Sequence, residues 1–359
     1  MRHCLVIALL AFAAAATSGC ATIGYYAQSF AGQYEVLAKR RPIAAVVADP
    51  ATPIRIRGRL ELVGRLREFA AAKLDLPAQG SYASYAAIGR RYVVWNVFAT
   101  PALSLDPIQS CFPVIGCLSY RGYFSAEGAA RHARTLETRG HDVYVGGVAA
   151  YSTLGWFDDP VLDTMITWSD TQVARFLFHE LAHQKLYVRD DTAFNEAYAE
   201  AVAESGVDAW LAATASPDAR QAHAQEQRHD GAILTLIATV RDELRTLYSS
   251  PAGPDDKRRH KALILTSLRD RYERLRAAGG KDTGYDSWMS SGVNNAKIAA
   301  VATYHDDVPA FRNLLAAVSG DFPAFHRASA RIGALRPEQR RTCLDGLKVV
   351  GPAFLARCQ

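Results

Sequence analysis

Two histidines and a glutamate stand at the spacing that a catalytic zinc site requires. His179 and His183 are four residues apart, so on a helix their imidazoles lie one turn apart on the same face. Glu180 follows the first histidine, where its carboxylate can act as a general base toward a water activated by the metal. The pattern indicates a zinc-dependent hydrolase, most readily of peptide bonds. The alternative is a helix that carries these three residues without any chemical role.

The residues around this motif predict a helix. Ser169 or Asp170 can cap its N-terminus, and residues 171–187 contain neither proline nor glycine. Apolar side chains recur at helical spacing, at Val173, Phe176, Leu177, Leu181 and Tyr187. The motif therefore lies in the middle of a helix, where its geometry works.

Glu196 is the expected third ligand. Catalytic zinc has three protein ligands and keeps one position for water. Twelve residues separate His183 from Glu196, enough for one helix to end and a second, over residues 194–213, to return across the site. Glu200 is the alternative third ligand. Because it lies one helical turn after Glu196, it is better placed to accept a hydrogen bond from the second ring N–H of a ligand histidine. In the alternative reading both are solvated helix carboxylates.

The segment resembles the gluzincin metallopeptidases. His179-Glu180-Leu181-Ala182-His183-Gln184 followed by Asn195-Glu196-Ala197-Tyr198-Ala199 is similar to the H-E-L-A-H-Q and N-E-G-F-A segments of the large zinc aminopeptidases. The resemblance implies one Zn²⁺ held by His179, His183 and Glu196, with Glu180 as the base. The G-A-M-E-N motif, whose carboxylate binds the substrate amine in those enzymes, is absent from the sequence. The sequence thus favours a peptidase more firmly than an aminopeptidase.

Most of the chain also resembles a family of bacterial lipoproteins described as predicted aminopeptidases. The similar segments are residues 19–33, 111–124 and 147–157, the two zinc-ligand segments and Asn294-Asn295-Ala296. This resemblance implies an envelope-bound aminopeptidase with peptide substrates.

The first twenty residues indicate export. Arg2 precedes an apolar run over residues 5–16, which is too short to span a hydrocarbon core of about 30 Å, and small residues then lead to Cys20. We expect a signal peptide over residues 1–19 and a lipid on Cys20, with a non-lipidated secreted form as the alternative. Ala21 rather than Asp follows the cysteine, which favours the outer membrane, on its periplasmic side.

Four cysteines remain after the signal and Cys20 are set aside: Cys111, Cys117, Cys343 and Cys358. They allow three disulfide connectivities. We favour the local pairs, Cys111 with Cys117 and Cys343 with Cys358, because each closes a short loop, and because disulfides persist in an oxidising periplasm. A second, cysteine-based metal site is the alternative, but the spacings do not resemble a zinc knuckle.

The fold expected is α+β and predominantly helical, with a gluzincin-like zinc-peptidase core, a small upstream β-sheet and a helical C-terminal half. We expect an anchored segment over residues 20–52, the peptidase core over 53–215 and a helical region over 216–359. Within these, helices are expected over residues 25–46, 53–76, 125–138, 218–249 and 255–278, and shorter ones from 295 onward; strands are expected over 84–98, with a break near Gly89, and over 142–152.

The second strand has an expected function. In zinc peptidases of the type that the sequence resembles, an edge strand upstream of the zinc helix pairs with extended substrate by adding a strand to the sheet, and small residues here would let a substrate backbone approach. The expected substrate residues are Gly147, Val148, Ala149, Ala150 and Tyr151. An ordinary buried strand is the alternative.

The oxyanion of a tetrahedral intermediate needs a hydrogen-bond donor. Tyr304 and His305 are the candidates, because related enzymes use a tyrosine or histidine downstream of the zinc helices, and Tyr151 is a weaker alternative. The alternative is that Tyr304 is an ordinary aromatic residue at the end of a helix and that His305 is a solvated histidine. The remaining histidines, among them His326, are expected at the surface.

The net charge and the distribution of basic residues bear on the possible partners of the protein. The formal charge is +5 and the basic residues are dispersed, so nucleic-acid binding is not expected, and the sequence does not indicate an oligomeric state. Two rivals to the peptidase remain: a zinc amidase acting on peptidoglycan cross-links, and an inactive envelope binding or chaperone protein. The retained Glu180 argues against the inactive form, since an inactive descendant is free to lose the base.

Overall fold

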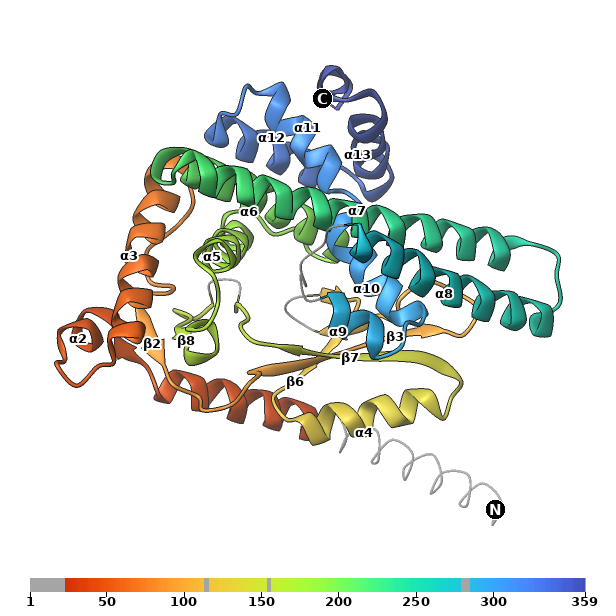
Figure 1. The fold of residues 1–359 in the computed structure, drawn as a ribbon, viewed down its shortest axis with the longest axis horizontal. Coiled ribbons are helices and arrows are strands. Elements are labelled where there is room, and N and C mark those ends of the chain that lie inside the picture. The colour runs from red at the N-terminus through yellow and green to blue at the C-terminus, as the bar shows by residue number, and fades with distance from the viewer. Residues whose placement is uncertain (1–22, 113–115, 154–155, 279–284, 359) are drawn as a thin grey trace, which may run out of the picture.

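A computed structural model describes residues 23–112, 116–153, 156–278 and 285–358. The expected signal segment and Cys20 lie outside these residues. The described chain is predominantly helical with three small sheets, which confirms the α+β class (Figure 1). None of the helices described is both long and apolar enough to cross a membrane.

The expected N-terminal helix is broken in two. Residues 23–38 form one helix, called here the N-terminal helix, and α2 (Ile43–Ala48) follows after the short strand β1 (Arg41–Pro42). A single helix over residues 25–46 was therefore wrong. Pro42 lacks an N–H and disfavours helical dihedrals at Arg41, and β1 pairs with β2 (Ser84–Ala86) instead.

The central sheet holds the expected second strand at its edge. β3 (Val94–Pro101) lies between β6 (Arg121–Tyr123) and β7 (His141–Val148), and both pairings are antiparallel. Within the described residues β7 has β3 as its one partner strand. Figure 1 shows α4 (Ala126–Glu137) along this sheet.

Both expected strands are shorter than predicted, because side chains take over their backbone groups. β7 ends at Val148 rather than residue 152: Thr164 Oγ1 donates to the Ala149 carbonyl (2.6 Å), and the Thr153 N–H donates to Asp159 (2.6 Å). The break near Gly89 is confirmed, and it is wider than expected. Asp163 accepts the Ile88 and Gly89 N–H groups (2.9 Å each), so β2 and β3 join different sheets.

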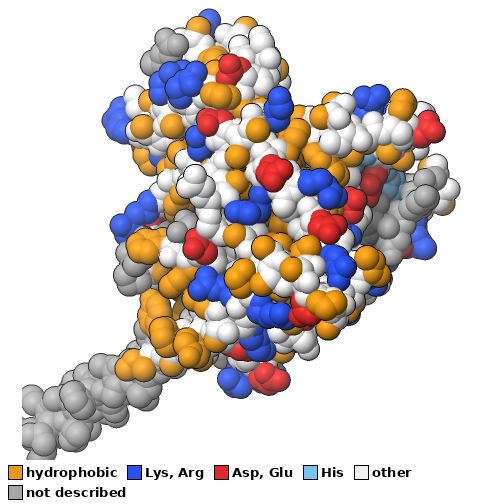
Figure 2. Space-filling model, turned by 90° about the vertical axis from the view of Figure 1, so that its left-hand side faces the viewer, with side chains coloured by type: hydrophobic (Ala, Val, Ile, Leu, Met, Phe, Trp, Pro, Cys, Tyr) orange, Lys and Arg blue, Asp and Glu red, His pale blue; other side chains and the backbone are white. Residues whose placement is uncertain are grey.

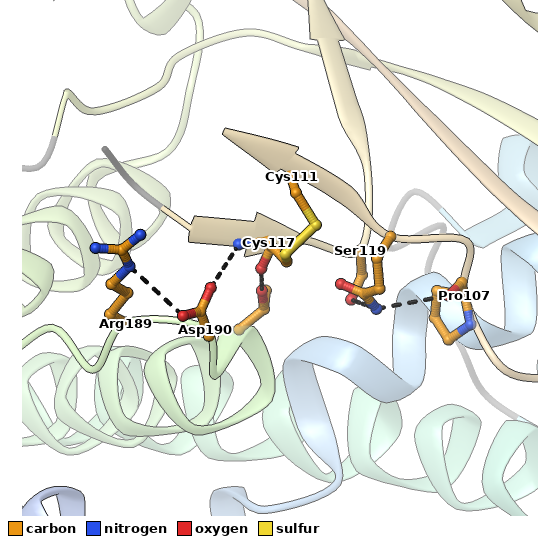
Figure 3. Close-up of a disulfide and its surroundings, with 8 residues drawn as sticks. Pro107, Cys111, Cys117, Ser119, Arg189 and Asp190 are labelled. Atoms are coloured by element: carbon orange, nitrogen blue, oxygen red, sulfur yellow. Dashed lines mark hydrogen bonds and ion pairs between the residues drawn. A yellow bond between two sulfur atoms is a disulfide. The ribbon is translucent and has the colours of Figure 1, made fainter. Parts of the chain in front are cut away.

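Cys111 and Cys117 lie in a small hairpin rather than an irregular loop. β4 (Ser110–Phe112) pairs with β5 (Gly116–Leu118), and the disulfide joins opposite residues of the two strands. Asp190 accepts the Cys117 N–H (2.9 Å) (Figure 3), so the hairpin is fixed to the turn after the motif helix. The second disulfide joins Cys343 to Cys358, and the predicted pairing is confirmed.

We expect the Cys343–Cys358 disulfide to stabilise the C-terminus appreciably. It links α13 (Pro337–Val350) to the following 3-10 helix η2 (Pro352–Arg357), and both cysteines are buried. A cross-link that closes a loop of 15 residues contributes about 3 kcal/mol to the free energy of unfolding. The double Ser variant should lower this free energy in urea denaturation by about that amount, whereas an unchanged value would show that the bond adds no stability.

The main hydrophobic core joins the motif helix to α3 near the start of the chain and to the last helices of the chain. It packs α5 (Asp170–Lys185) and α6 (Thr192–Thr214) against α3 (Ile54–Leu74) and α11–α13. The core therefore crosses the expected boundary after residue 215. The other helices are α7 (Pro217–Ser249), α8 (Pro254–Ala277), α9 (Tyr285–Ser290), α10 (Asn295–His305), α11 (Val308–Ala317) and α12 (Phe322–Ala334); the remaining short elements are β8 (Val161–Leu162) and η1 (Asp163–Met165).

Candidate metal centre

The motif helix α5 begins with a complete capping box. The Ser169 hydroxyl accepts the Gln172 N–H, and the Gln172 side chain accepts the Ser169 N–H (2.9 Å), so two otherwise unpaired N–H groups are satisfied. Leu177 and Leu181 are fully buried in the core. Because Leu177 and Leu181 hold one face of α5 against the core, His179, Glu180 and His183 lie on another face of the helix.

The turn to α6 is fixed by one asparagine. The Asn195 side chain accepts the Val188 N–H and donates to the Val188 carbonyl, both at 2.7 Å. Asp191 caps α6 by accepting the Phe194 N–H (3.0 Å). These bonds set the start of α6 against the end of α5, and Glu196 faces the two histidines as a result.

Three donor atoms converge between the two helices. His179 Nε2 lies 3.1 Å from His183 Nε2 and 3.2 Å from Glu196 Oε2, and His183 Nε2 lies 3.6 Å from the same oxygen. Tetrahedral ligands at the usual zinc distances lie about 3.3 Å from one another. The observed separations bracket that value, so the set fits a metal ion, and these three residues are the group found among the described residues that could hold one.

Glu200 contacts the other nitrogen of His179. Its Oε2 lies 3.3 Å from Nδ1, which leaves Nε2 for the metal position. Arg175, one turn before His179 on α5, pairs with the second oxygen of Glu200. Burial opposes ionisation of Glu200, but Arg175 and His179 outweigh it and hold its pKa well below the usual range. Glu200 thus stays anionic and orients the ring.

The histidines and carboxylates of the cluster stabilise one another's charged forms. Burial disfavours charge on Glu196, yet His183 and His179 lower its pKa to about 2. Burial also disfavours the charged form of His179, but Glu196 and Glu200 raise its pKa to about 10. Three carboxylates surround two imidazoles, since Glu180 adjoins them. A metal ion at the centre would take the place of the proton on His179 beside these carboxylates.

We expect Glu200→Gln to weaken metal binding while leaving the three ligands in place. The amide is the same size but carries no charge, so it orients His179 less firmly, and loss of such an outer partner costs about 10–100-fold in metal affinity. Titration against a fluorescent chelator measures the change. Glu204→Gln is the matched control, because Glu204 contacts Arg175 and Arg312 but none of the donors. Equal affinities in both variants would contradict the role of Glu200.

The donors open into a cavity of about 180 Å³. Its walls come from α5, α6, the end of β7 and the segment after the disulfide hairpin. The lining residues beyond the donors are Asn96, Leu118, Tyr120, Val148, Ala150, Tyr151, Ser152, Glu180, Tyr187, Thr192 and Asn195. Within the described residues none beyond Glu196 lines it, so the helical C-terminal half contributes no residue to this cavity.

Glu180 reaches the cavity from beside the first histidine. Burial raises its pKa, and this effect outweighs the opposing influence of His179 and His183. Ser152 contributes a hydrogen bond to Glu180. The carboxylate is therefore more basic than a solvated one, which suits a group that must accept a proton.

Two tyrosines of the cavity were missed from the sequence. Tyr120 and Tyr187 line it, and burial raises the pKa of both hydroxyls, so both stay protonated and able to donate. Tyr187 ends the motif segment, and Tyr120 follows the hairpin closed by Cys111 and Cys117. Aromatic residues next to a disulfide loop and after the motif helix were the available signal.

The expected substrate residues divide into two groups. Val148, Ala150 and Tyr151 line the cavity, whereas Gly147 and Ala149 do not. A side chain at Gly147 would meet the Tyr92 ring at 2.4 Å, so this glycine permits the close approach of Tyr92. The far end of the β7 edge is covered, because the Asn294 amide donates to the Val143 carbonyl (2.8 Å).

His305 lies apart from the donor cavity. It ends α10 and lines a second, larger cavity between α6, α7, α10 and α11, together with Arg175 and Glu204. Glu200, which also acts on the pKa of His305, lies near both sites. The Tyr304 side chain lies outside the described part of the chain. The structure thus brings His179, Glu180, His183, Glu196 and Glu200 together, and leaves His305 in the second cavity.

Comparison with known protein families gives a match over most of the chain. The model of a protein family described as putative aminopeptidase matches residues 24–344. No curated protein and no solved structure matches the chain. The match includes α5, α6 and β7, and hence every described residue that lines the donor cavity.

Proposed function

Because the chain belongs to the putative aminopeptidase family, we propose that it is a zinc-dependent peptidase of the gluzincin type. The convergence of His179 Nε2, His183 Nε2 and Glu196 Oε2 carries the proposal. Two neutral imidazoles and one carboxylate are a ligand set of catalytic zinc. When bound, zinc lowers the pKa of a coordinated water and polarises a substrate carbonyl.

Glu180 is the proposed general base. It lines the cavity beside both histidines and is not needed as a ligand, so its carboxylate is available to take a proton from water. The raised pKa brings Glu180 closer to neutral pH, so the group can accept the proton from water and then pass it to the leaving amine.

The hydroxyls of Tyr120 and Tyr187 are the proposed donors to the oxyanion. Both belong to the cavity wall and both stay protonated at neutral pH. A pre-oriented donor in a site shielded from water stabilises the developing charge. These residues replace His305 in this role, because His305 lines the other cavity.

Peptide substrates fit the edge of β7. The strand has one partner among the strands described, and its last residue, Val148, lines the donor cavity. A substrate backbone that added itself beside residues 145–148 would run toward Glu180. Such pairing binds any extended peptide through its main chain and leaves side-chain preference to the cavity wall.

Whether the enzyme requires a free substrate N-terminus depends on the acidic groups that could bind the amine. Glu180 and Glu196 are the acidic residues that line the described cavity, and both have other proposed roles. A free substrate amine would therefore have to share Glu180 or meet a neutral wall. The proposal of aminopeptidase specificity is therefore supported by the family description alone, whereas the proposal of peptide-bond hydrolysis is also supported by the residues of the site.

A mixed peptide library tests the function. The zinc-loaded protein and the same protein treated with a chelator are incubated with peptides of free and acetylated N-termini, and the products are identified by mass spectrometry. Cleavage by the loaded protein alone supports the proposal, and loss of cleavage on acetylation assigns an aminopeptidase. Equal cleavage with and without chelator, or none by the loaded protein, would overturn it.

The proposed location is the bacterial envelope, with a lipid on Cys20 and the domain facing the periplasm. Two disulfides support an oxidising compartment. The residues before the N-terminal helix have the sequence of an export signal that ends in a cysteine. An acyl mass on Cys20, measured on protein from membranes, is the test.

A further inference from the structure

The N-terminal helix has apolar side chains on its outer side as well as on the side that packs in the core, where Val36 is buried. Its exposed positions are Ile23, Gly24, Tyr26, Ala27, Phe30, Ala31, Tyr34 and Ala38. None of them carries a charge or an amide. Ile23, Phe30 and Tyr34 are each 65% or more exposed. Together these eight residues are called here the outer face of the N-terminal helix.

The polar residues of the same helix face inward. Gln28 accepts the Phe124 N–H (2.9 Å), and Gln33 accepts the Tyr151 hydroxyl. Glu35 pairs with Arg90 (2.7 Å). These bonds fix the rotation of the helix about its axis, so the outward aromatic side chains cannot simply turn toward the core.

An ordinary surface helix presents a polar face to water, whereas the outer face of this helix carries no charged or amide side chain. Large apolar side chains scattered singly over a surface need no explanation, but a contiguous group marks a contact with another molecule or a membrane. Figure 2 shows hydrophobic side chains gathered at the lower left of the molecule.

The chain itself indicates what covers this face. The helix begins three residues after Cys20, and three residues span at most about 11 Å. A chain held in a membrane at Cys20 therefore keeps Ile23 at the membrane surface. At the other end of the helix Lys39, Arg40 and Arg41 are exposed. Lys39 and Arg41 pair with Glu35 and Asp49, whereas Arg40 contacts a backbone carbonyl and keeps a charge that can meet anionic headgroups.

We propose that the outer face lies on the membrane as an interfacial helix and sets the orientation of the whole protein. The inference rests on the proposed envelope location. Isoleucine and phenylalanine would enter the acyl boundary, and the tyrosine rings would lie at the headgroup level, where such rings are enriched. Because polar contacts fix the helix to the body, binding of this face fixes the direction in which the donor cavity opens.

Vesicle flotation separates this face from the lipid anchor. The chain without its expected signal peptide (residues 20–359), carrying Cys20→Ser, is mixed with vesicles of phosphatidylethanolamine and phosphatidylglycerol, with and without the additional substitutions Phe30→Ser and Tyr34→Ser. We expect about a tenfold or greater fall in the bound fraction when the two aromatics are lost. The matched control is Leu263→Ser with Val349→Ser, which removes two exposed apolar side chains elsewhere and should change nothing.

A depth measurement on the wild-type anchor gives an independent test. In vesicles containing brominated lipid, the fluorescence of Phe30→Trp should be quenched, and that of Leu263→Trp should not. Equal flotation with and without the two aromatics, together with an unquenched Phe30→Trp, would overturn the inference. So would a dimer in sedimentation that disappears with the aromatics, because the face would then meet a second copy. Failure of the anchor is seen separately, as a missing acyl mass on Cys20.

Discussion

Glu180→Gln should abolish most peptide hydrolysis while the protein keeps its metal. The amide is the same size as the carboxylate, but it cannot accept a proton. A positioned general base contributes about 10²–10⁴-fold to a rate, so kcat should fall by that factor. The substitution should not unfold the protein, because the buried carboxylate of Glu180 is costly to ionise and has a raised pKa. Single-turnover assays with bound zinc counted in the same sample measure both effects.

The control for this variant is Glu127→Gln, an exposed glutamate in the first turn of α4. It makes the same chemical change away from the cavity and should leave kcat unchanged. Near wild-type kcat for Glu180→Gln would contradict the assignment of the base. Loss of zinc from that variant would show instead that Glu180 helps to hold the metal.

His183→Ala should lose the metal altogether. His183 is one of three donors, and its ring is buried against Glu196. Removing a ligand should cost more than the roughly 10–100-fold that removal of an outer partner costs. Peptide hydrolysis should fall with zinc content. Metal analysis after dialysis measures the first, and the peptide assay measures the second.

His260→Ala is the matched control, since His260 is exposed on α8 and distant in sequence from the cluster. It should retain zinc as the wild type does. Full zinc occupancy in His183→Ala, with native circular dichroism, would contradict the ligand assignment. A loss of zinc with a loss of helical signal would call for the smaller change, His183→Gln.

The sequence was most informative where geometry is local. A spacing of four residues on a helix places His179 and His183 on the same face, independently of the tertiary structure. The approach of Glu196 was also foreseeable, because a short turn leaves few ways for α6 to return along α5. Local cysteine pairing followed from loop length in the same way.

Prediction failed where the decisive partner is distant in sequence. Tyr120 belongs to the cavity because Asp190 fixes the disulfide hairpin beside the motif helix, and no local pattern indicates that contact. His326 was expected at the surface. It is buried, with Tyr198 at 2.7 Å and the Leu74 carbonyl at 2.8 Å, because a ring with two satisfied nitrogens is tolerated in a core.

Strand ends depended on side chains from elsewhere. β7 ends where Thr164 and Asp159 take the backbone groups of the next residues. β6 and β8 are too short to show an alternating pattern. The outer face of the N-terminal helix was hidden for a similar reason, because apolar positions at helical spacing do not show whether that face meets the core or another surface.

The most direct test of the central claim is anomalous X-ray diffraction at the zinc absorption edge, on crystals of the protein purified without chelator. The account predicts one strong peak per chain, about 2.0–2.2 Å from His179 Nε2, His183 Nε2 and a Glu196 oxygen. Zinc held at another place, or an ordered cluster without a peak in zinc-soaked crystals, would contradict it.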